Sequence, residues 1–278
     1  MPYKNLLVHI DDSKSNAKRL EAAFSLALTH DAHLTGLYVA PDPELPSNLR
    51  AEVPPELLRT MWEHVEERVA NAKERFLKEM EKAGVRSEVR ALHCPASRMP
   101  EVVTLHGRYT DLVILGQPEP DSNGDVDPDA VEDVVLSVGR PALVIPYIGA
   151  GETLGERIVV AWDGGREAAR AVNDAIPLLE RAKHVVVLVI DPHKGGHGEE
   201  PGADIALHLA RHGIEVEAEH IGAGDLSVAD ALLSRLTDRE ADLLVMGAYG
   251  HSRLREWVLG GTTRQIFKQM TVPVLMSH

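Results

Sequence analysis

The sequence predicts an α/β protein made of two tandem, doubly wound domains, each built on a five-stranded parallel sheet. Three observations carry this prediction. The chain has 278 residues, which exceeds the usual size of one domain and allows two modest cores. Its apolar runs are short and continuous, as in strands buried on both faces of a parallel sheet, and helical patterns lie between them. The strand pattern of the first half also recurs in the second half.

The repeat indicates the same succession of strands along the chain in both halves. Each half opens with an apolar strand that ends in an aspartate and a small or polar turn, and two further apolar segments recur later in the same order. The matching pairs are 5–13 with 157–165, 110–116 with 241–247, and 141–146 with 273–276.

Helical patterns separate these strands in both halves. The expected helices cover 14–27, 55–83 and 99–106 in the first half, and 167–179, 204–212 and 228–239 in the second. A βαβ order repeated in this way predicts right-handed crossovers and a doubly wound sheet.

The two halves differ in one long segment. The first half carries an insertion, roughly residues 40–75, with a proline-rich loop and a helix, where the second half has only a glycine-containing loop over 192–198. We predict one domain over residues 1–148, a glycine-rich linker over 149–156 and a second domain over 157–278.

Charge and cysteine content narrow the classes of partner. The formal net charge is −14, which disfavours nucleic acid and anionic membranes because both require basic surfaces. Cys94 is the single cysteine, so no internal disulfide is expected and a reducing compartment fits. The N-terminus has no signal-peptide pattern, and no apolar stretch is long enough to span a bilayer. We therefore expect a cytoplasmic protein.

Two glycines follow the predicted strand over 241–247. Gly247 and Gly250 lack the Cβ atoms that would keep a phosphate away from the backbone amides. In doubly wound sheets, ligands bind at the carboxyl ends of the strands. These two glycines therefore predict one wall of an anion cradle.

The second wall precedes the last helix. Gly260 and Gly261 stand before a helical segment whose first-turn N–H groups favour anions. Thr262 or Thr263 could cap this helix or donate a hydroxyl. Four glycines in this strand-to-helix context predict a phosphate site.

This pattern, Gly-x2-Gly-x9-Gly followed by a small or hydroxyl residue, resembles the ATP-binding signature of the universal stress protein family. The resemblance covers the whole chain as two family domains in tandem. It implies a Rossmann-like fold of the adenine nucleotide alpha hydrolase-like type, and ATP with Mg²⁺ as the ligand. It also implies that the last strands of the halves, 142–145 and 274–276, pair within the chain as an intramolecular pseudo-dimer. A homodimer of tandem chains stays open.

The resemblance also implies roles for single residues. Asp163 matches the aspartate that faces the adenine side, and Val189 matches a position whose backbone contacts adenine. The cradle positions carry over as Gly247, Gly250, Gly260 and Thr262. Gly261 departs from the family pattern, which has a serine or threonine there. The hydroxyl contact to phosphate is therefore lost, or it is moved to Thr262 or Thr263.

The first half departs much further from this signature. Gly116 is followed by a proline-rich acidic stretch up to Asp129, without a second glycine at the right spacing. Carboxylates there would repel phosphate, and prolines remove amide donors. We expect this half to have lost the cradle, although Asp11 stands at the adenine-side position. The acidic stretch is either a solvated loop or a cation site.

Two other kinds of site deserve comparison. Asp11 and Asp12 resemble the acidic pair of phosphoacceptor receiver domains, but the third strand ends without the required aspartate. A zinc site could draw on scattered thiol and imidazole groups, although none of the usual ligand spacings occurs. Its candidate ligands are His9, His93, Cys94, His106, His193 and His197.

The sequence favours binding over catalysis. It contains neither a Gly-x-Ser-x-Gly elbow nor a Gly-Lys-Ser/Thr phosphate loop, so we expect at most slow, Mg²⁺-dependent ATP hydrolysis. We expect a nucleotide-responsive protein of the stress response whose first domain is structural or binds a partner. The alternative is a module for an acyl or sugar-nucleotide metabolite, held against an apolar stripe of the inserted helix. That stripe consists of Leu57, Leu58, Met61, Trp62 and Val65.

Overall fold

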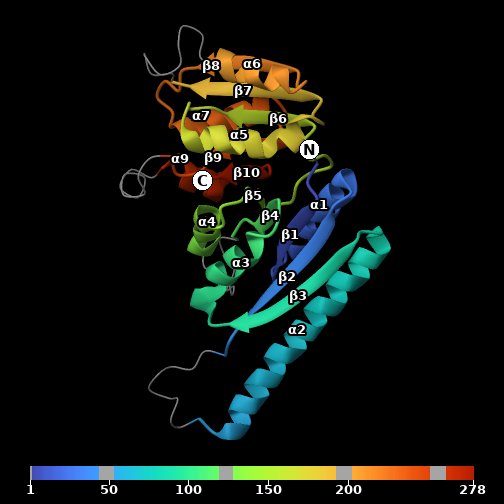
Figure 1. The fold of residues 1–278 in the computed structure, drawn as a ribbon. Coiled ribbons are helices and arrows are strands. Elements are labelled where there is room, and N and C mark those ends of the chain that lie inside the picture. The colour runs from blue at the N-terminus through green and yellow to red at the C-terminus, as the bar shows by residue number, and fades with distance from the viewer. Residues whose placement is uncertain (1, 44–52, 119–127, 192–201, 251–260) are drawn as a thin grey trace.

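The computed structural model describes residues 2–43, 53–118, 128–191, 202–250 and 261–278. These residues form one continuous ten-stranded sheet with helices on both faces (Figure 1). The strand order is β3-β2-β1-β4-β5-β10-β9-β6-β7-β8. Each half thus repeats one order, in which its first strand lies between its second and fourth strands.

The helices and strands alternate as the repeat predicts. In the first half they are β1 (Asn5–Ile10), α1 (Asn16–His30), β2 (His33–Pro41), α2 (Pro55–Ala83), β3 (Ser87–Cys94), the 3-10 helix η1 (Ala96–Arg98), α3 (Met99–Gly107), β4 (Leu112–Gly116), α4 (Pro128–Ser137) and β5 (Ala142–Ile145). In the second half they are β6 (Arg157–Ala161), α5 (Arg166–Leu179), β7 (His184–Ile190), α6 (Ala203–Arg211), β8 (Val216–Ile221), α7 (Val228–Asp238), β9 (Leu243–Gly247), α9 (Thr262–Gln269) and β10 (Val274–Ser277).

The halves meet at the last strand of each. Strands β5 and β10 pair antiparallel, whereas every other pairing in the described sheet is parallel. The paired residues are Val144 with Val274, Leu143 with Leu275, and Ala142 with Met276. The predicted pairing within the chain is confirmed, and it turns two five-stranded sheets into one.

The sheet separates two apolar cores. Helices α1, α2, α5 and α6 bury their apolar sides against one face, and α3, α4, α7 and α9 bury theirs against the other. The eight inner strands are buried along most of their length, as their continuous apolar runs predict. The edge strands β3 and β8 are largely half-buried or exposed, and both carry charged side chains, which discourages pairing with other chains.

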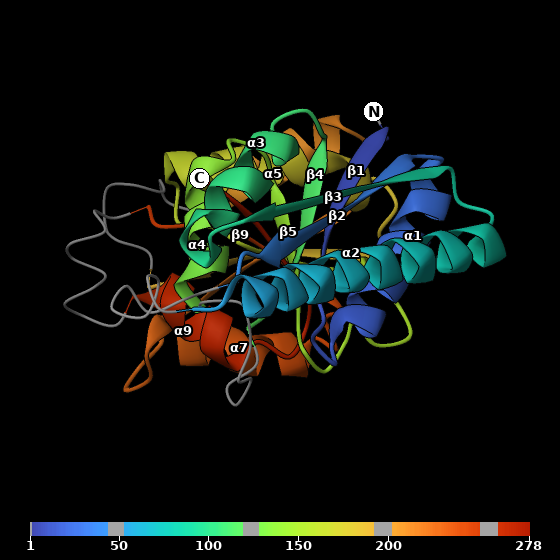
Figure 2. The ribbon, with the colours of Figure 1, turned by 90° about the horizontal axis from the view of Figure 1, so that it is seen from below.

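The inserted helix α2 has the predicted bounds, but only part of its length is buried against the sheet. It lies beside β3 and continues past the end of the sheet (Figure 1), and in the view from below it again runs alongside β3 (Figure 2). Its buried residues recur at helical spacing: Val65, Ala72, Phe76 and Met80. In the apolar stripe, Val65 is buried, but Leu57 is 51% exposed and Trp62 is 38% exposed.

Two buried histidines should make the fold sensitive to acid. His9 lies in β1 and His30 at the end of α1, and burial lowers the pKa of each side chain to about 4. Between this value and the ordinary value near 6.5, the unfolded chain binds more protons than the native chain. The free energy of unfolding should therefore fall by about 2 kcal/mol per histidine between pH 7 and pH 5, as measured by urea unfolding.

Two variants isolate this effect. His9→Leu removes one of the titrating groups, so this variant should lose about 2 kcal/mol less than the wild type over the same pH range. His64→Gln alters an exposed histidine of α2 and should behave as the wild type. An equal loss in all three proteins would mean that His9 does not contribute to the acid sensitivity.

Candidate functional site

In the second half, the strand order reverses between β6 and β9, and we call the region outside the carboxyl ends of these two strands the crevice of that half. Strand β6 pairs with β7 on one side and with β9 on the other. Ligands of doubly wound sheets bind at the carboxyl ends of the strands at this point. Asp163 follows β6, and Gly247 ends β9. The topology therefore brings the predicted aspartate and the first predicted glycine to one crevice.

Close packing explains why residue 247 is a glycine, and Gly250 has looser surroundings. A Cβ added at Gly247 would lie 2.6 Å from the amide nitrogen of Ala168 and 2.7 Å from the carbonyl carbon of Glu167. A Cβ at Gly250 would lie 3.3 Å from Oε2 of Glu167 and 3.7 Å from Oδ2 of Asp163. Gly247 thus lets the end of β9 touch the start of α5, and Gly250 stands beside two carboxylates.

Glu167 is a site residue that the sequence analysis missed. It lies in the first turn of α5, is 5% exposed, and forms an ion pair with Arg166. Burial by itself would raise the pKa of this carboxyl, but hydrogen bonds from the Arg166 side chain and from the backbone lower it. A charged Glu167 therefore borders the crevice. An acidic residue in a first helical turn is common, so this position gave no signal of its own.

Asp163 and Val189 occupy different environments. Asp163 is exposed, and its Oδ1 accepts the amide hydrogen of Gly165 at 2.8 Å, which shapes the turn into α5. Val189 is buried in β7, where it pairs with His220 of β8. The valine side chain is buried beside Gly202 at the start of α6. Only the backbone of Val189 is therefore left to contact a ligand.

The second wall begins at α9. Gly261 is the N-cap residue, without a side-chain capping bond, and Thr262 opens the helix. Thr263 is buried, and its Oγ1 accepts the amide hydrogen of Tyr249 at 3.2 Å. This bond joins the loop after β9 to the start of α9. Gly260 lies outside the described residues.

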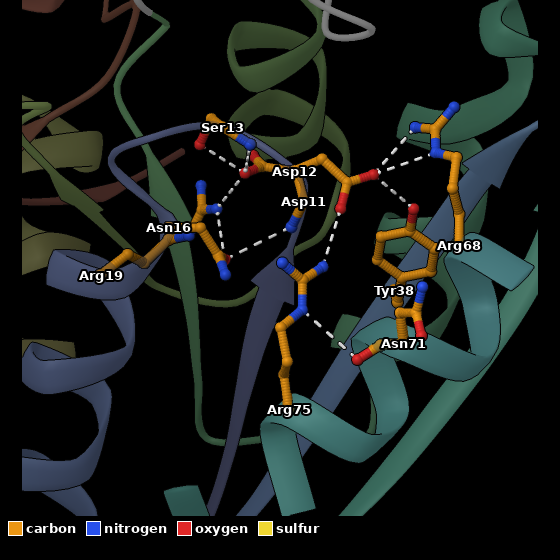
Figure 3. A network of polar contacts seen from close by, with 9 residues as sticks. All are labelled: Asp11, Asp12, Ser13, Asn16, Arg19, Tyr38, Arg68, Asn71 and Arg75. Carbon is orange, nitrogen blue, oxygen red and sulfur yellow. Dashed lines mark hydrogen bonds and ion pairs between the residues drawn. The ribbon is translucent and has the colours of Figure 1, made fainter.

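In the first half, the corresponding crevice is filled by an arginine. Arg19 of α1 is buried, and its Nη2 lies 2.7 Å from Oδ1 of Asp11 (Figure 3). A Cβ added at Gly116 would collide with Nη1 of Arg19. Burial would raise the pKa of Asp11, but the charge and hydrogen bond of Arg19 hold it well below its usual range. Asp11 is thus committed to an internal ion pair.

Asp12 holds the inserted helix to the sheet. Its Oδ2 accepts hydrogen bonds from the Tyr38 hydroxyl at 2.7 Å and from Nε of Arg68 at 3.1 Å, and its Oδ1 accepts one from Nη2 of Arg75 at 3.0 Å (Figure 3). Two turns of α2 therefore converge on one carboxylate. Neither aspartate of the Asp11–Asp12 pair resembles an open phosphoacceptor site.

The described residues do not gather the candidate zinc ligands. Nδ1 of His93 lies 2.8 Å from Oδ1 of Asp42, His106 contacts Arg90, and Cys94 is buried. No group of three or more histidine, cysteine, aspartate or glutamate side chains is placed to hold a metal within the ranges that the structure describes. His193, His197 and most of the acidic stretch before α4 lie outside those ranges.

Relatives of known family match both halves of the chain. The model of the universal stress protein family matches residues 2–118 and 155–278. A universal stress protein of Synechocystis sp. is 26% identical over 207 residues, which cover 70% of this chain and 67% of that protein. Among the helices described, none is long and apolar enough to cross a membrane.

Solved structures share the tandem fold. A universal stress protein from Archaeoglobus fulgidus is 17% identical, with a TM-score of 0.74 over 98% of this chain and 97% of that one. The cytoplasmic domain of a prokaryotic cation chloride cotransporter is 14% identical, with a TM-score of 0.50 over 98% and 94% of the two chains. These likenesses establish the fold, and the sequence match over both halves shows that the chain belongs to the universal stress protein family.

Proposed function

We propose that this protein binds ATP in its second half and acts in the cytoplasmic stress response, with the first half in a structural or partner-binding role. One observation carries the proposal: the side-chain-free positions Gly247 and Gly250 stand at the β6–β9 crevice, and a hydrogen bond ties their loop to the start of α9. The domain limits proposed above, 1–148 and 157–278 with a linker over 149–156, place the whole crevice in the second domain.

Each part of the crevice has a proposed role. Backbone amides of the glycine loop and of the first turn of α9 bind the phosphates. Because Thr263 already accepts the Tyr249 amide and is buried, the half-buried Thr262 is the better placed hydroxyl. Asp163 and the backbone at Val189 face the adenine. The proposed contacts are Asp163, Val189, Gly247, Gly250, Gly260, Gly261, Thr262 and Thr263.

Mg²⁺ fits this site as a companion of the phosphates. The described residues offer no three-ligand metal group, so the ion would be held chiefly by the nucleotide. Asp163 and Glu167 both lie close to Gly250, where their charges oppose an uncompensated triphosphate. A bound cation would reduce that repulsion. The sequence contains no Gly-Lys-Ser/Thr phosphate loop of the kind found in dedicated ATPases. We therefore propose binding with at most slow hydrolysis.

The alternative ligand site beside α2 has less support. A groove of about 230 Å³ lies between α2 and β3, with Trp62, Val65, Leu92 and His93 among its lining residues. Ligand sites for small molecules usually enclose roughly 300–1,000 Å³. An acyl or sugar-nucleotide metabolite would therefore remain largely outside this groove.

Heating the protein with and without Mg-ATP tests the proposal. Saturating ATP should raise the unfolding temperature of the wild type, because a ligand that binds only the native state stabilises it. Gly250→Asp should abolish that rise, since a third carboxylate would join Asp163 and Glu167 at the cradle. Gly84→Asp places the same carboxylate at the left-handed C-cap of α2 (φ +67°) in the first half. This change lowers stability with and without ATP, so the rise caused by ATP should be kept. If Mg-ATP raised the unfolding temperature of Gly250→Asp as much as that of Gly84→Asp, the assignment would be contradicted.

Titration calorimetry should find one nucleotide per chain. The crevice of the first half is occupied by the Asp11–Arg19 ion pair, which a nucleotide would have to displace at the expense of a buried charge. A fitted stoichiometry near two in the wild type would mean that the first half also binds. Gly250→Asp should then retain one site rather than none.

A further inference from the structure

We propose that Glu132, a residue of the first half, positions the nucleotide loop of the second half through the Tyr249 hydroxyl. This inference rests on the proposed ATP site. Glu132 lies on α4, and Arg264 of α9 reaches it across the junction of the halves, where β5 and β10 pair. The second half would then depend on the first for the shape of its binding site.

The backbone of Tyr249 needs support. Its φ is +55°, in the left-handed region that glycine adopts easily and that costs other residues about 1 kcal/mol or more. Tyr249 stands between Gly247 and Gly250, in the first wall of the cradle. Its amide hydrogen bonds to Oγ1 of Thr263 at 3.2 Å, in the second wall. The conformation of this one residue therefore sets how the two walls meet.

Glu132 supplies the second tether of Tyr249. The tyrosine hydroxyl donates to Oε2 of Glu132 at 2.5 Å, and Tyr249 is 8% exposed. Nε of Arg264 donates to the other carboxylate oxygen, Oε1, at 3.3 Å, and Nη2 of Arg264 donates to Asp129 at 3.0 Å. The Glu132 side chain is 12% exposed. One nearly buried carboxylate thus contacts the glycine loop and the first turn of α9 together.

Such an arrangement prepares the loop before a ligand arrives. A loop that is already held in its binding conformation loses less conformational freedom on binding. Because a hydrogen bond to a charged acceptor is worth more than one between neutral groups, the Tyr249–Glu132 bond can hold a strained backbone in place. By thermodynamic reciprocity, nucleotide binding would also strengthen the contact of the loop with α4.

Binding measurements on paired variants test this role. Tyr249→Phe and Glu132→Ala should each weaken ATP binding about tenfold, and the double variant should be no weaker than Glu132→Ala alone, because both changes remove one link. Glu132→Gln keeps an oxygen acceptor for the hydroxyl but removes its charge, so it should recover part of the affinity. Glu101→Ala, at an exposed acid of α3, should leave it unchanged.

Hydrogen exchange without nucleotide separates this inference from the ATP assignment. The amide of the Tyr249 peptide should exchange faster in Tyr249→Phe and Glu132→Ala than in the wild type or in Glu101→Ala. If the wild type does not bind ATP but Tyr249→Phe and Glu132→Ala still exchange faster than it does, the proposed function is rejected and the link between Glu132 and the loop is retained. The role of Glu132 would be overturned by an unchanged exchange rate in the two single variants. It would also be overturned by any of three affinity results: additive losses in the double variant, no recovery in Glu132→Gln, or tighter ATP binding in Glu132→Ala.

Discussion

The antiparallel pairing of β5 with β10 is the constraint on which the rest of the structure depends. Each half ends in a short apolar strand that would otherwise be the exposed edge of a five-stranded sheet, with unpaired backbone groups that invite other chains. Pairing the two strands satisfies both edges and leaves their side chains buried in the cores. It also brings the end of β4 close to α9, where the side chain of Gln117 donates to the carbonyl oxygen of Phe267 at 2.8 Å.

The two halves share one strand order but differ in the groups that lie at their crevices. In both halves a glycine ends the strand that faces the reversal point, and in both halves its missing Cβ lets another group come close. In the second half that group is the backbone at the start of α5, and the space beyond it borders the glycine loop. In the first half it is the guanidinium of Arg19, which neutralises Asp11 and fills the space. A single long side chain thus distinguishes the first half from the half that we propose to bind the nucleotide.

The proposed anion site is compatible with the negative overall charge of the chain. A protein with a formal net charge of −14 does not attract anions over long distances. At short range, however, backbone amides at a helix start and in a glycine loop act as fixed dipoles that do not depend on net charge. The carboxylates of Asp163 and Glu167 beside Gly250 leave such a site most favourable to an anion that carries its own cation.

The sequence by itself determined the fold class, the succession of strands along the chain and most helix bounds, because apolar periodicity and a repeat report which faces are buried. The six helices expected from periodicity begin and end within three residues of α1, α2, α3, α5, α6 and α7. It also indicated Gly247 and Gly250, since glycines directly after a strand are a local signal, and the resemblance to the family added Asp163. Only the tertiary structure decided the roles of Arg19, Glu167 and Glu132. Charged residues in helices are common in any sequence, and their partners here are brought close by strand order and by the junction of the halves. Contacts between residues far apart in the chain leave no periodic trace, so they had to be seen in space.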